Sequence, residues 1–171
     1  MHAFSKFGAG AATVLAAVGA LTVAGSTAAT ADTNSVVYSC GSGSQTQQFD
    51  ERITITAPTD ASVGDSIVLD VSVQHDNQAQ DPFPAGSITA ELDVTVGGAV
   101  SDEVTATGLT NEDRVPAGDA PLLTGGQAEV TVPNAGDVTF TPDTFTVVNN
   151  GVAVSCTPAE AAPVIATTHV S

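Results

Sequence analysis

The stretch Ile88-Thr-Ala-Glu-Leu-Asp-Val-Thr-Val96 decides the fold class of this chain of 171 residues. Apolar residues occupy every even position from 88 to 96, and threonine or an acid occupies every odd position between them. A period of two that is rich in β-branched residues is typical of a β-strand with one buried face. The same alternation recurs at Ile53–Ile55 and Ile67–Val73. The sequence therefore predicts a protein built of strands.

Shorter strand-like segments follow one another along the rest of the chain, separated by turn-forming residues. They are Val36–Cys40, Val104–Thr107, Ala128–Val132, Val138–Thr141, Thr144–Val148, Val152–Cys156 and Val164–Val170. No long segment after residue 31 has the apolar period of a helix. Many short strands in one domain of this size predict an immunoglobulin-like β-sandwich of about seven to nine strands.

Asn150-Gly151 is the strongest hairpin signal in the sequence, because a type I′ turn needs positive φ at both central residues. A two-residue turn here fixes the register of the flanking strands. It pairs Asn149 with Val152, Val147 with Val154, and Phe145 with Cys156. The apolar members of these pairs then share one face, which places Cys156 on the buried side beside Phe145.

Gly97-Gly98 resembles a second tight hairpin, but the register argues against it. A two-residue loop would set Leu92 opposite Glu103 and Val94 opposite Ser101. That arrangement pairs core positions with solvent positions, which a strand of period two does not tolerate. We therefore expect a longer loop of odd length, or a crossing to the other sheet.

The first 31 residues have the three parts of a secretory signal peptide. Lys6 carries the positive charge, Gly8–Ala24 is apolar, and Ala29-Thr30-Ala31 is a small-x-small cleavage site. The alternative is a membrane anchor, but a stable span needs about 20 strongly apolar residues, and the apolar part is short and rich in Gly, Ala and Thr. We expect a signal-peptide helix that is cleaved after Ala31, leaving a single secreted domain over residues 32–171 with no membrane span.

Charge restricts the partners of this domain. Cleavage removes Lys6 and leaves Arg52 and Arg114 against 19 acids, so the formal charge of residues 32–171 is 2 − 19 = −17. Nucleic acid is excluded as a partner, since its binding relies on Lys and Arg. High net charge also keeps a secreted chain dispersed, so we expect a monomer. Stacking on sugar rings is not expected either, because the domain has one Tyr and no Trp.

Cys40 and Cys156 are the two cysteines of the chain. In an exported protein an even pair predicts a structural disulfide. The alternatives are a reactive thiol and a metal ligand. Neither cysteine has a C-x-x-C partner or a histidine nearby in sequence. We therefore expect one bond between the two ends of the domain.

The chain resembles a group of uncharacterised secreted domains of high-GC Gram-positive bacteria. In that group a Tyr-Ser-Cys near the mature start and a Val-x-Cys near the end bracket one immunoglobulin-like sandwich; here these are Tyr38-Ser39-Cys40 and Val154-Ser155-Cys156. Pro58–Val73 is similar to the entry into a strand of bacterial immunoglobulin-like domains. The resemblance implies a fold and an extracellular location, and it carries no known activity.

Catalytic patterns are weak throughout. Gly41–Gln45 lacks the Gly-x-Ser-x-Gly spacing of a nucleophile elbow and is expected to be a flexible turn. His75 and His169 are expected to be exposed and without a role. The chain holds 19 acids, so some carboxylates fall near one another by chance. We predict no catalytic residue and no cofactor, and keep a secreted hydrolase with a carboxylate site as an alternative.

Calcium is the one metal with any sequence support, because it takes oxygen ligands from clustered carboxylates. The weak candidates are Asp76, Asp81, Glu112, Asp113 and Asp119. None lies in an EF-hand loop, so no metal site is predicted, and a calcium-stabilised extracellular module stays a second alternative.

The expected function is a secreted, non-enzymatic binding or structural domain that acts outside the cell or at its surface. Its ligand is not indicated by any motif. An unknown protein or cell-surface partner would meet it through sheet edges or through two long loops, His75–Ser87 and Thr110–Gln127.

Overall fold

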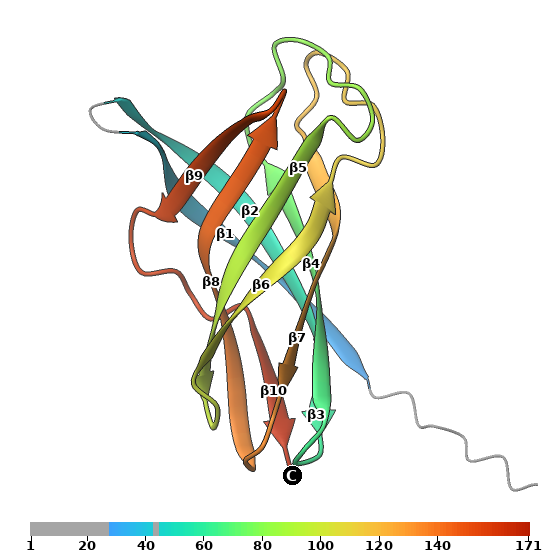
Figure 1. The fold of residues 1–171 in the computed structure, drawn as a ribbon, viewed down its shortest axis with the longest axis vertical. Coiled ribbons are helices and arrows are strands. Elements are labelled where there is room, and N and C mark those ends of the chain that lie inside the picture. Colours follow the sequence, from blue (N-terminus) through green and yellow to red (C-terminus); the bar gives the residue numbers. More distant parts are fainter. Residues whose placement is uncertain (1–27, 43–44) are drawn as a thin grey trace, which may run out of the picture.

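The computed structural model describes residues 28–42 and 45–171, which form ten strands (Figure 1). The strands are β1 Ala29–Ser42, β2 Gln45–Pro58, β3 Asp60–Ala61, β4 Ser66–His75, β5 Ile88–Gly98, β6 Asp102–Thr110, β7 Leu122–Thr131, β8 Gly136–Asn149, β9 Val152–Pro158 and β10 Ala166–Val170. The prediction of an all-β domain is confirmed. Within the described ranges, no helix is long and apolar enough to cross a membrane.

The strands are hydrogen-bonded into a single sheet, where an immunoglobulin-like sandwich would have two. Eight strands follow one another in the order β8-β5-β6-β7-β4-β2-β1-β9, and a pairing of β9 with β8 closes them into a ring. The length of β8 explains the closure, because one of its edges serves two partners. Gly136–Phe140 pairs with β10 and Phe145–Asn149 pairs with β9. The short β3 pairs in parallel with β10, at the lower end of Figure 1.

β8 joins two segments that the sequence predicts as separate strands, Val138–Thr141 and Thr144–Val148. Its register against β5 shifts between the pairs Val94–Pro142 and Leu92–Phe145. This bulge accommodates Pro142, which has no backbone N–H to donate to a neighbour. The buried Tyr38 hydroxyl donates to the Asp143 carbonyl at the bulge over 2.9 Å. The strand therefore continues through a proline that normally ends one.

The predicted β8–β9 hairpin is confirmed residue by residue. Asn150 and Gly151 have φ of 50° and 76°. The strands pair Asn149 with Val152, Val147 with Val154, and Phe145 with Cys156. The two turn residues were sufficient to predict the register, because positive φ at two adjacent residues allows few loop types.

The connection between β5 and β6 is also as expected. Val96 pairs with Asp102, so the loop spans residues 97–101 and has an odd length. Leu92 then faces Ala106 and Val94 faces Val104, which keeps apolar residues opposite one another. The five apolar residues of β5 that decide the fold are all at most 6% exposed and lie in the hydrophobic core inside the ring.

The predicted disulfide is present between Cys40 in β1 and Cys156 in β9. These strands are paired at three positions only, Tyr38–Pro158, Ser39–Thr157 and Cys40–Cys156. The bond therefore joins two neighbouring strands of the ring that share few paired positions.

The predicted signal peptide falls mainly on residues outside the described ranges. Ala29 and Ala31, on which the expected cleavage depends, lie in β1 and pair with Pro58 and Thr56. Cleavage after Ala31, and the division into residues 1–31 and 32–171, stay predictions.

Candidate functional site

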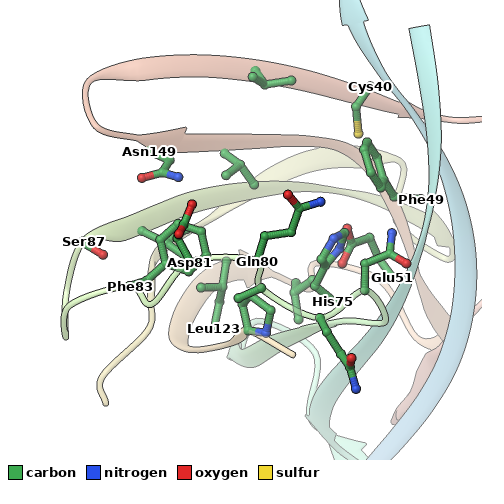
Figure 2. Close-up of a pocket in the computed structure, with 18 of the residues that line it drawn as sticks. Cys40, Phe49, Glu51, His75, Gln80, Asp81, Phe83, Ser87, Leu123 and Asn149 are labelled. Atoms are coloured by element: carbon green, nitrogen blue, oxygen red, sulfur yellow. The ribbon is translucent and has the colours of Figure 1, made fainter. Parts of the chain in front are cut away.

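A cavity of about 680 Å³ lies inside the ring at the end that carries the β8–β9 hairpin (Figure 2). Its wall is largely apolar, with side chains from seven strands of the ring and from the loop after β4. The apolar wall includes Phe49, Val73, Phe83, Phe145, Val147 and Val154. A concave apolar space with a few polar groups is the usual form of a small-molecule site.

The β8–β9 hairpin contributes the wall that the sequence predicts. Phe145, Val147, Val154 and Cys156 were expected to share one face, and all four line the cavity. The apolar residues of β8 and β9 on this face therefore border the cavity, and Phe145 and Cys156 also belong to the hydrophobic core.

The loop of residues 76–87 forms another side of the cavity, and the loop of residues 111–121 supports it. Phe83 and Val115 exchange backbone hydrogen bonds of 2.9 Å. The buried Asn111 donates through Nδ2 to the Pro84 carbonyl over 2.7 Å, and its Oδ1 accepts from Ile88 N over 2.8 Å. Thus the structure brings together the two long loops that the sequence singled out.

Glu51 and His75 form a buried ion pair in the cavity wall. They face each other across β2 and β4, and Glu51 Oε1 lies 2.6 Å from His75 Nδ1. The Glu51 side chain is 5% exposed, and the His75 ring packs against Phe49 with 5.4 Å between centroids. His75 is therefore half-buried and partnered, and the expectation that it is exposed is wrong.

The alternation of residues in the sequence indicates the inward positions of Glu51 and His75. Because both residues are polar, they are not recognised as inward-facing from the sequence alone. Ile53 and Ile55 point inward on β2, and Ile67 to Val73 do so at every second residue on β4. Continuing each alternation by one step reaches Glu51 and His75. Two polar residues at inward positions of facing strands indicate a built polar site within an apolar wall.

Burial and the hydrogen bond between the two side chains shift the pKa values of the pair. Desolvation raises the pKa of the Glu51 carboxyl above its ordinary value of 4.5, against the lowering effect of His75. The hydrogen bond to Glu51 raises the pKa of His75 above 6.5, against its own desolvation. Both shifts make the folded protein bind more protons than the unfolded chain from pH 4.5 to somewhat above 6.5.

We predict that the free energy of unfolding falls as pH rises through this window. The contribution of His75 is complete below its unfolded pKa and is lost as pH passes its raised folded pKa, and that of Glu51 changes in the same direction. Urea unfolding at about pH 5 and about pH 8 should show this fall, and Glu51→Gln should reduce it. The comparison is His169→Gln: the hydrogen bond to Asp137 also raises the pKa of His169, but this pair is exposed to solvent, so its removal should reduce the fall much less. An equal pH dependence in Glu51→Gln and the unmodified protein would contradict the prediction.

Two buried acceptor atoms of the cavity residues have no hydrogen-bond partner among the described residues. They are Glu51 Oε2 and Asn149 Oδ1. Figure 2 shows Glu51 with His75 and Phe49 toward one side of the cavity, and Asn149 with Ser87 and Phe83 toward the other. An unpartnered buried acceptor costs roughly 1–3 kcal/mol, so both sides of the cavity would gain from a donor.

The weak calcium candidates are dispersed. Asp76 pairs with Arg52 over 2.7 Å, and Asp81 lines the cavity. Glu112, Asp113 and Asp119 are exposed on the supporting loop. In the part of the chain that the structure describes, no three His, Cys, Asp or Glu side chains are grouped to hold a metal ion.

The residues considered for catalysis lie apart from one another. His169 is exposed and pairs with Asp137 over 2.8 Å, away from the cavity. The acids of the cavity wall are Glu51 and Asp81, and Glu51 is bonded to His75. Ser87, the serine of the cavity wall, donates its hydroxyl to the Pro84 carbonyl over 2.8 Å. Of the segment Gly41–Gln45, residues 43 and 44 lie outside the described ranges.

Comparison with known proteins finds no matching family model, no matching curated protein and no matching solved structure. The resemblance to secreted immunoglobulin-like domains therefore extends to an all-β domain with one disulfide and identifies no family. The cavity is interpreted from its own residues.

Proposed function

We propose that this chain is an exported, non-enzymatic binding domain that holds a small, largely apolar molecule in the cavity at the open end of its ring. The observation that carries the proposal is a cavity of about 680 Å³ walled by apolar side chains. Its volume lies within the range of roughly 300–1,000 Å³ that is usual for sites of small ligands. The apolar wall supplies affinity through burial, and the polar groups supply orientation.

Export is supported by the signal-like residues 1–31 and by the disulfide, since such bonds persist in oxidising compartments. A binding role is favoured over a hydrolase because the histidine of the cavity is bonded to a carboxylate and the Ser87 hydroxyl is bonded to a backbone carbonyl. General-base chemistry on a serine would need that hydroxyl to face the histidine.

The test uses Nile red, a neutral apolar dye whose emission rises and shifts to shorter wavelength in apolar surroundings. We expect the unmodified protein to bind it with a saturable signal. Val154→Trp places a large ring in the cavity wall at a position that is 37% exposed, so the fold should tolerate it. We expect this variant to lose at least about tenfold in affinity, because the ring occupies the ligand's space.

The matched control is Val68→Trp on β4, where the side chain is 48% exposed and does not line the cavity. It should bind the dye like the unmodified protein. No binding by the unmodified protein, or equal loss in both variants, would overturn the proposed function.

A further inference from the structure

The polar atoms of the cavity define the kind of head group that fits it. Glu51 is 4% exposed, and its Oε2 accepts no hydrogen bond from any described residue. Asn149 Oδ1, toward the other side, is a second such atom. Both are acceptors, so a ligand that brings hydrogen-bond donors would satisfy them.

The charges around the cavity favour a cation over an anion. Glu51 and Asp81 are acids of its wall, and neither Lys nor Arg is among the described residues that line it. Asp50 and Asp76 lie close enough to Glu51 to act on its ionisation. The formal charge of the whole chain is −16. A ligand carboxylate or phosphate would meet neither Lys nor Arg there, the wall's His75 is already bonded to Glu51, and the ligand would approach against a negative field.

We infer that the ligand is a cationic amphiphile, an apolar molecule whose protonated amine donates to Glu51 Oε2. This inference rests on the proposed function and names the ligand class of that same cavity. Glu51 Oε1 stays with His75, so the amine meets an oxygen that is already oriented. The apolar body then lies along Phe49, Val73 and Val147, with Asn149 at the far side for a second polar group.

The low polarity of the cavity wall explains why a charged amine is favoured as the donor. The same low polarity makes the unpartnered oxygen of Glu51 costly when no ligand is bound. A charge-assisted hydrogen bond in an apolar wall is about twice as strong as a neutral one. The carboxylate is desolvated before the ligand arrives, so binding the amine does not require further removal of water from Glu51. An alcohol of the same shape would donate to the same oxygen without the charge.

The test compares octylamine, octanol and octanoate, which share one chain and differ in the head group. Each displaces Nile red from the unmodified protein near neutral pH, below its micelle-forming concentration, while circular dichroism verifies that the protein stays folded. We expect octylamine to bind at least about tenfold more tightly than octanol, and octanoate to bind weakest.

Glu51→Gln keeps the size of the side chain and removes its charge, and it should abolish the preference for the amine while octanol binding persists. The control is Glu91→Gln on β5, which makes the same change at an exposed acid that does not line the cavity. It should keep the preference. An equal loss in both variants would overturn the inference, because it would assign the effect to the general field.

Equal affinity for the three octyl compounds, or displacement by none of them, would also overturn the inference while Nile red binding leaves the proposed function standing. Absence of Nile red binding would instead remove the proposed function itself. The series on the unmodified protein decides the matter even if Glu51→Gln does not fold.

Discussion

Replacing Cys40 and Cys156 together with alanine is expected to lower the free energy of unfolding by about 4–5 kcal/mol. The bond joins residues 116 positions apart and so restricts almost the whole unfolded domain. It also fastens β1 to β9, which are paired at three positions only. Urea unfolding followed by circular dichroism should show the loss, and the melting temperature should fall by roughly 10–20 °C.

Reduction provides the control for this prediction. A reducing agent should destabilise the unmodified protein by a similar amount and leave the double variant unchanged, because that variant has no bond to lose. Alanine is the appropriate replacement, since both cysteines are less than 9% exposed and serine would bury a hydroxyl. A double variant as stable as the oxidised protein would contradict the prediction.

The second large effect is expected at Gly98, at the end of β5. Its φ is +83°, and a Cβ placed there would lie 2.1 Å from the carbonyl oxygen of Asp137. Ala99 N donates to that same oxygen over 2.8 Å, so the two backbones cannot separate without losing a hydrogen bond. Gly98→Ala should therefore cost about 3–5 kcal/mol, from unfavourable φ and from steric overlap together.

Gly151→Ala is the matched control for this substitution. Gly151 has a similar φ of +76°, but a Cβ there would meet nothing within 4 Å. It should cost only about 1–2 kcal/mol, the penalty for positive φ. Chemical unfolding of both variants measures the difference, which reports the close approach of the two backbones. Equal losses would show that the backbone at Gly98 moves to admit a side chain.

The fold could be predicted where local chemistry leaves few choices. Asn150-Gly151 determined a turn, and the turn determined a register that the structure reproduces. The alternation at Ile88–Val96 was sufficient to exclude a two-residue turn at Gly97-Gly98. The ring could not be predicted in this way, because it depends on the edge of β8 being shared by β9 and β10, and sequence alternation does not indicate which strands become neighbours.

The candidate site was predictable in part. The apolar wall from Phe145 to Cys156 follows from the hairpin register. Glu51 and His75 continue the inward alternations of β2 and β4. A charged residue at such a position is normally interpreted as the end of the strand, unless its partner is known. Asn111 had no signal at all, because two of its three side-chain hydrogen bonds are made to Pro84 and Ile88, which are 27 and 23 residues away in sequence and are brought to it only by folding.

The position of the disulfide also determines how the domain would respond to a pulling force. Every residue that lines the cavity lies between Cys40 and Cys156. Tension applied at the two ends of the chain would reach the bond after β1 and the C-terminal segment had peeled away, and would pass through it. The chain between the cysteines, which lie 116 positions apart and roughly 400 Å apart along an extended chain, would carry no load. The segment that supplies the cavity wall would thus stay unstretched in a domain that is pulled from its termini.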